Sequence, residues 1–98
     1  MPLKNVLKQL VNHMKKIFKY ELASKDSTLM LPKDAEILTV KLQNGTPTLW
    51  ALVNPHTSEL EERCIRIFGT GWELDDNMKY IETYMEEYFV WHVFELIK

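Results

Sequence analysis

The stretch EILTVKLQNGTPTLWALVN, residues 36–54, decides the fold of this chain. Apolar and polar residues alternate on both sides of Asn44-Gly45, which is typical of two β-strands that each bury one face. Asn and Gly tolerate the positive φ angles of a two-residue turn. The stretch therefore predicts a β-hairpin made of residues 36–43 and 46–54.

The register of this hairpin follows from its turn, which pairs Val40 with Leu49 and Ile37 with Leu52. One face then belongs to the core and consists of Leu38, Val40, Leu42, Leu49, Ala51 and Val53. The other face mixes polar residues with Ile37, Trp50 and Leu52, and it is too apolar at one end for a plain solvent surface. We expect this second face to be a binding surface, covered by the N-terminal segment or by a second subunit.

Shorter strands are predicted on both sides of the hairpin. Period-two alternation or short apolar runs between turn-forming residues place them at residues 18–22, 28–31, 64–68, 79–85 and 88–97. The last of these is apolar on both faces, which is typical of a central strand covered on both sides, with His92 as a core histidine bonded to a neighbour. Ser58 and Glu61 have the spacing of a capping box and predict a single helical turn. Six to seven short strands predict a mainly β protein, a small antiparallel β-sandwich or barrel.

The N-terminal segment carries the clearest helical pattern. Its apolar residues recur at spacings of three and four, at Leu3, Val6, Leu7, Leu10, Val11 and Met14. This predicts an amphipathic helix over residues 1–14, followed by a single β domain over residues 15–98. Leu3, Leu7, Leu10 and Met14 are its predicted docking or oligomerisation face. Binding of the helix to a membrane is disfavoured, because the stripe has no aromatic anchor before Phe18.

Composition limits the chain to one folded domain in a reducing compartment. Its 98 residues are 46% hydrophobic and 27% charged, which is ordinary for a globular domain. Cys64 is the single cysteine, so an internal disulfide and a zinc site with paired cysteines are excluded. No apolar run approaches the ~20 residues that cross a bilayer, and the N-terminus lacks the features of a secretory signal. We expect a cytoplasmic protein with no membrane partner.

The charge is unevenly distributed and bears on the partners. Residues 1–20 contain five lysines and no acidic residue, whereas residues 57–98 contain ten acidic and four basic residues. An acidic body repels phosphate, so no specific nucleic-acid partner is predicted.

Gly69-Thr70-Gly71 and the adjacent Trp72 are the second predicted binding surface. The turn follows a strand and brings backbone amides together, but it lacks the third glycine of a dinucleotide motif and the Gly-Lys-Ser/Thr ending of a nucleotide-triphosphate loop. A plain turn is therefore the preferred interpretation, and phosphate binding stays open. Trp72 and Trp50 lie among polar neighbours and are the tryptophans expected at a binding surface.

No catalytic residue, metal ligand or cofactor is predicted. Glu61 and Glu62 near Cys64 disfavour a reactive thiolate. The acidic pair Asp75-Asp76 is most simply a solvated turn. The alternative is an unrecognised hydrolase or nucleotide-modifying enzyme that uses Asp75, Asp76 or His56.

Four segments resemble a family of small uncharacterised proteins encoded by bacteriophages and prophages. They are MKKIFKYEL (residues 14–22), AEILTVKLQNGTPTLWALVNP (35–55), RIFGTG (66–71) and FVWHVFEL (89–96), in the same order. Members of that family begin near the position of Met14. Residues 1–13 are then either a helix peculiar to this chain or sequence upstream of the true start, and the continuous helical stripe favours the helix.

This resemblance implies a phage or prophage accessory protein in a bacterial cytoplasm, and it transfers no site residues. We expect a non-enzymatic protein that acts by binding a host protein or a small host signal molecule, an anti-defence role included. The alternative is a structural or assembly component. A homo-oligomer is expected in either case, because the apolar face around Trp50 and the detachable helix offer surfaces for self-association.

Overall fold

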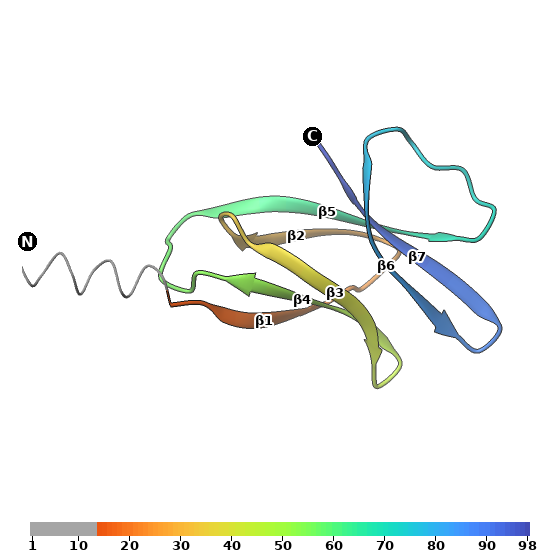
Figure 1. Ribbon diagram of the computed structural model, residues 1–98, viewed down its shortest axis with the longest axis horizontal. Helices are drawn as coiled ribbons and strands as arrows, with labels where there is room; N and C mark the ends of the chain where they lie inside the picture. Colours follow the sequence, from red (N-terminus) through yellow and green to blue (C-terminus); the bar gives the residue numbers. More distant parts are fainter. Residues whose placement is uncertain (1–13) are drawn as a thin grey trace, which may run out of the picture.

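The computed structural model describes residues 14–98, which form seven β-strands in two layers (Figure 1). The strands are β1 (Lys16–Glu21), β2 (Asp26–Pro32), β3 (Glu36–Gln43), β4 (Thr46–Val53), β5 (Leu60–Gly69), β6 (Met78–Glu86) and β7 (Phe89–Leu96). They build two antiparallel sheets, a three-stranded one of order β1-β4-β3 and a four-stranded one of order β2-β5-β7-β6. The prediction of a mainly β fold with six to seven strands is confirmed, and two separate sheets fit the sandwich rather than the barrel.

The predicted N-terminal helix lies outside the described residues, together with Leu3, Leu7 and Leu10. Met14 is described, and it is exposed and belongs to no helix or strand. The predicted helical turn at Ser58 to Glu61 is wrong, because β5 already begins at Leu60. The polar side chains of this connection instead stabilise turns, as Asn54 Oδ1 accepts a 3.0 Å hydrogen bond from the amide of His56.

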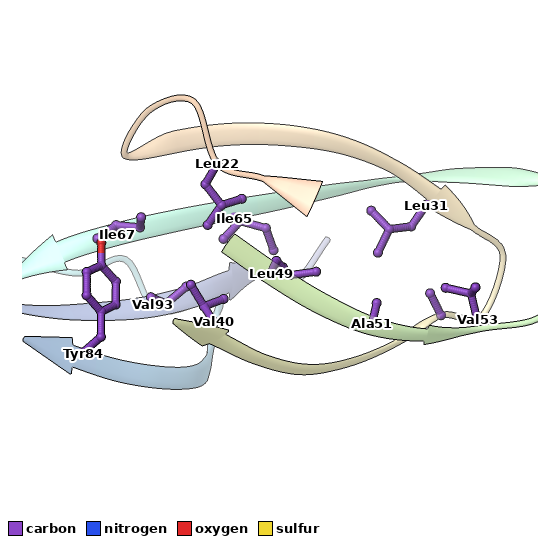
Figure 2. Close-up of a cluster of buried hydrophobic side chains, with 11 residues drawn as sticks. Leu22, Leu31, Val40, Leu49, Ala51, Val53, Ile65, Ile67, Tyr84 and Val93 are labelled. Carbon is purple, nitrogen blue, oxygen red and sulfur yellow. The ribbon is translucent and has the colours of Figure 1, made fainter. Parts of the chain in front are cut away.

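The hydrophobic core lies between the two sheets, which both contribute to it (Figure 2). The largest apolar side chains buried completely are Leu31, Val40, Leu49, Val53, Ile65 and Val93. Burying one side chain of this size completely stabilises a fold by about 1.5–3 kcal/mol. Packing between the sheets is therefore the main source of stability.

The hairpin of β3 and β4 follows the predicted register only in part. Its turn has φ angles of 51° at Asn44 and 79° at Gly45, and Val40 faces Leu49 as predicted. A β-bulge between Ile37 and Thr39 then shifts the register by one residue, so that Ile37 pairs with Ala51 instead of Leu52.

The bulge overturns two predictions about the faces of the hairpin. Leu38 is the extra residue and is 42% exposed, so its predicted place in the core is wrong. Ile37 packs against the core and does not share the face of Trp50 and Leu52. An inserted residue reverses the alternation beyond it, and the sequence pattern, which is apolar on both sides at this point, gives no sign of the insertion.

A second bulge lies in β6, and the two bulged strands are neighbours. The register of β6 against β7 shifts between Tyr80 and Glu82, which leaves Ile81 as the extra residue. Thr39 of β3 donates a 2.6 Å hydrogen bond to Glu82 Oε1, and Lys41 Nζ lies 3.7 Å from the same oxygen. The hydrogen bond from Thr39 is the main cause that holds the pKa of Glu82 below its usual value. The sandwich is thus joined along the β3–β6 side.

Strand β7 lies between β5 and β6 and so is a central strand, as predicted. The prediction that both of its faces are covered is wrong. Val93 on the inner face is completely buried, whereas Val90, His92 and Phe94 on the outer face are only half-buried. Neighbouring rings shield this outer face in part, because Phe94 packs edge-on against Phe68 and Tyr80.

Candidate functional site

A cleft of about 450 Å³ lies at one end of the four-stranded sheet. At this end β5 leaves the sheet and the β6–β7 hairpin turns (Figure 1). We call this cavity the aromatic cleft, and it is lined by Gly69, Thr70, Trp72, Tyr88, Phe89, Val90 and Trp91. Its volume is within the range of pockets that accommodate small molecules. The lining is mainly apolar, and its polar side-chain groups are the hydroxyls of Thr70 and Tyr88 and the indole nitrogens of Trp72 and Trp91.

Three rings build the walls of the cleft. Phe89 stacks on Trp91 with ring centroids 5.8 Å apart and an interplanar angle of 21°. Trp72 meets Trp91 edge-on at 5.7 Å and 79°. Both geometries are those that aromatic pairs prefer, and each pair contributes about 0.5–1.5 kcal/mol beyond the burial of its area. The walls are therefore fixed by contacts within the protein.

The turn after β5 places Trp72 against the sheet. The amide of Trp72 donates a 3.1 Å hydrogen bond to the carbonyl oxygen of Gly69. A Cβ atom at Gly69 would lie 2.8 Å from Cε2 of the Trp72 ring, which is closer than carbon atoms approach without a shift. Gly71 has a φ of 89°, a conformation that glycine adopts without strain. The two glycines thus have different tasks, a close contact at Gly69 and a bend at Gly71.

Lys25, from the connection between β1 and β2, lies over the ring of Trp91. Its Nζ atom is 3.9 Å from the ring centroid, in the geometry of a cation–π interaction. The indole Nε1 of Trp91 is buried and has no hydrogen-bond partner within residues 14–98. An unsatisfied buried donor costs about 1–3 kcal/mol, so packing rather than hydrogen bonding holds this ring.

A chain of side-chain hydrogen bonds connects the rim of the cleft with the outer face of the sheet. The Thr70 hydroxyl is 2.8 Å from His92 Nε2, and His92 Nδ1 is 3.1 Å from the Thr83 hydroxyl. Thr83 is in turn 2.7 Å from the Tyr80 hydroxyl. The prediction that His92 is bonded to a neighbour is confirmed, but the residue is half-buried on the outer face, so its predicted place in the core is wrong.

A second concavity of about 270 Å³ also has Trp72 in its lining. We call it the polar hollow, and its lining comprises Lys25, Asp26, Arg66, Ile67, Phe68, Trp72, Glu73, Asp75 and Met78. Arg66 Nε is 2.6 Å from Asp26 Oδ1, so these two charges neutralise each other. Within residues 14–98, Glu73 and Asp75 form no ion pair. Trp72 is thus a wall shared by an apolar cleft and a hollow with surplus negative charge.

The structure brings together some of the predicted binding residues and separates others. Gly69, Thr70 and Trp72 line the aromatic cleft, and Gly71 lies in the same turn without lining it. Trp50 and Leu52 belong to β4 in the other sheet, on its outer face and half-buried. The two predicted binding surfaces are therefore separate, and the cleft contains no residue of the hairpin formed by β3 and β4.

Sequence reasoning missed the half of the cleft that the β6–β7 hairpin supplies. Tyr88, Phe89 and Trp91 were assigned to a strand covered on both sides. One feature of the sequence favours an exposed position for Tyr88. The acidic residues Glu86 and Glu87 directly precede Tyr88, and a hairpin tip with such neighbours is expected at the surface.

The three residues named above for a possible hydrolase, His56, Asp75 and Asp76, do not form one cluster. His56 precedes β5, whereas Asp75 lines the polar hollow beside Arg66, in the second half of this strand. Among residues 14–98, no three His, Cys, Asp or Glu side chains lie close enough together to hold a metal ion. Cys64 is buried, with its sulfur 3.8 Å from the Thr28 hydroxyl.

A buried ion pair, Arg63 with Glu95, lies toward the other end of β5. Glu95 accepts two hydrogen bonds from the Arg63 guanidinium, one of them 3.0 Å long from Nη2, and Arg63 Nη1 donates a 2.9 Å bond to the carbonyl oxygen of Ala35. The hydrogen bond with Glu95 raises the pKa of Arg63. The guanidinium connects the β2–β3 turn with β5 and β7, which is a structural task.

The fold and the cleft define a class of protein, a small domain of two facing antiparallel sheets with an aromatic cleft at one end. The chain belongs to the family described as Domain of unknown function (DUF7352), which matches residues 14–98. The match begins at Met14, as do the segments of the resemblance described above. Comparisons with curated proteins and with solved structures give no match. No helix in residues 14–98 has the length and hydropathy needed to cross a membrane.

Proposed function

We propose that the protein acts by binding rather than by catalysis, with the aromatic cleft as its binding site. In this proposal the partner is a host protein or a small host signal molecule. The chain is an accessory protein of phage or prophage origin, and countering a host defence is one role that such binding would serve. The observation that supports the binding site is the exposure of its rings. Trp72 is 53%, Phe89 58% and Tyr88 97% exposed.

Exposing these aromatic rings to water is unfavourable in free energy unless a partner covers them. Large apolar groups gathered at one place on a soluble domain mark interaction sites, and aromatic residues are enriched among the residues that dominate binding. The stacked Phe89–Trp91 pair and the contact of Trp72 with Gly69 hold the walls in place before a partner arrives. A preformed site loses little conformational entropy on binding.

Photo-crosslinking in bacterial cells tests the proposal. A photoreactive phenylalanine analogue replaces Tyr88 at the cleft or, as the control, Met30, which is also exposed but lies on β2. We expect one discrete crosslinked product from position 88 and none from position 30, with the position-88 product lost in a Phe89→Ala background. Equal products at both positions, or none at position 88, would contradict the proposal.

A structural or assembly role through homo-oligomers is the second candidate. It is supported by the outer face of the three-stranded sheet, where Ile17 is exposed next to Trp50 and Leu52. In this case the protein is a dimer or larger in light scattering, and Ile17→Lys shifts it to monomers. A monomer at high concentration for the unmodified full chain would exclude this role.

A further inference from the structure

We propose that the occupant of the aromatic cleft is a positively charged segment of a partner protein. An apolar side chain of the segment enters the cleft, and a Lys or Arg side chain enters the polar hollow beyond Trp72. This inference rests on the proposed function and adds the chemistry of the partner. It follows from the shared wall between the two concavities and from the distribution of charge around them.

The shared wall places both concavities within reach of one extended segment. Trp72 belongs to the lining of both the aromatic cleft and the polar hollow. In an extended chain, side chains two residues apart point the same way and are separated by about 6–7 Å. Two such side chains can straddle a single indole ring. An isolated small molecule in the cleft would leave the polar hollow unused.

The charges around Trp72 favour a positively charged side chain in the polar hollow. Arg66 is paired with Asp26, whereas Lys25 keeps its positive charge over the ring of Trp91 and so offsets only one of the two remaining carboxylates. Glu73 and Asp75 have no ion-pair partner in the part of the chain that the structure describes. Asp76 adds to their negative charge from the same connection. This field attracts Lys and Arg and repels phosphate, and so it disfavours nucleotides.

Fluorescence anisotropy with three labelled heptapeptides tests this chemistry on the full chain. In the first, Arg, Phe, Arg and Leu alternate with Ser, so that each Arg stands two residues from an apolar residue and points to the same side. The second has Glu in place of each Arg, and the third has Ser in place of each apolar residue. We expect the first peptide to bind at least about tenfold more tightly than either of the others. Its affinity should fall as salt is raised, because ions screen the attraction.

Matched variants locate the binding of the first peptide. Phe89→Ala should weaken it about tenfold, whereas Phe18→Ala, on β1 of the other sheet, should not. The double variant Glu73→Gln and Asp75→Asn should weaken it about tenfold. The double variant Glu21→Gln and Glu36→Gln removes the same charge elsewhere and should leave the affinity unchanged.

Two kinds of result would overturn the inference. The first is no binding of the Arg peptide at about 1 mM, or equal binding to the cleft variants and their controls. The second is tighter binding of the Glu peptide that Phe89→Ala abolishes. This second result would keep the cleft as a binding site and reject only its charge preference, so it separates the inference from the proposed function.

Discussion

Thr39 Oγ1 donates a 2.6 Å hydrogen bond to Glu82 Oε1 and so joins the edge strands of the two sheets. Each of these residues directly follows the extra residue of a β-bulge, Leu38 in β3 and Ile81 in β6. A bulge bends its strand and redirects the side chains next to it. The contact between the sheets therefore depends on two insertions that match each other.

Replacing Thr39 by Val keeps the shape of the side chain and removes this hydrogen bond. We expect Thr39→Val to lower the free energy of unfolding at pH 7 by about 1 kcal/mol. Since the folded state lowers the pKa of Glu82, the contribution is present above its ordinary value near 4.5 and is lost as the pH falls through the lower folded value. Urea unfolding at a series of pH values from 7 downward checks this, and a difference between variant and wild type that does not shrink toward low pH would contradict it.

Replacing only one partner of the Arg63–Glu95 ion pair should destabilise the fold more than replacing both partners by apolar residues. Arg63→Met leaves the carboxylate of Glu95 buried without its partner, and we expect a loss of about 3–5 kcal/mol. Adding Glu95→Leu to this variant should recover most of the loss, because no unpaired charge then remains. Chemical denaturation of the two variants measures the difference. A double variant as unstable as Arg63→Met would show that the pair itself contributes net stability.

Two glycine variants separate the shape of the cleft from the bend beside it. Gly69→Ala forces the ring of Trp72 away, because the new Cβ would lie 2.8 Å from it. We expect this variant to lose the exciton signal of the Trp72–Trp91 pair in circular dichroism. Gly71→Ala has no atom within 4 Å of the new Cβ, and it should keep the signal while losing about 1 kcal/mol of stability to backbone strain.

The bulge in β3 predicts opposite outcomes for two neighbouring apolar residues. Leu38→Ala should change the free energy of unfolding by less than about 1 kcal/mol, because Leu38 lies outside the core and is 42% exposed. Val40→Ala should cost about 1–3 kcal/mol, because Val40 is completely buried. Equal losses for the two variants, measured by thermal or urea unfolding, would show that Leu38 is part of the core.

The strands and the tight hairpin turn could be predicted because they depend on local patterns. Alternation marks a strand wherever one face is buried, and Asn44-Gly45 specifies its own turn. The bulges could not be predicted, because Leu38 and Ile81 are inserted to bring β3 and β6 together, and nothing within either strand signals that requirement. Half of the cleft was predicted from the turn at Gly69. The other half was missed because apolar residues such as Phe89 and Trp91 fit a buried strand equally well.

The paired bulges also affect how this protein resists aggregation. An open sheet edge is a template on which another chain can add a strand. Along β3 and β6 each sheet edge faces the other, and Glu82 places a carboxylate between them. Within residues 14–98, the edges left open are β1, which carries Lys16 and Lys19, and β2, which ends at Pro32. Lysines and proline both oppose strand addition, so every edge carries its own protection against fibril growth.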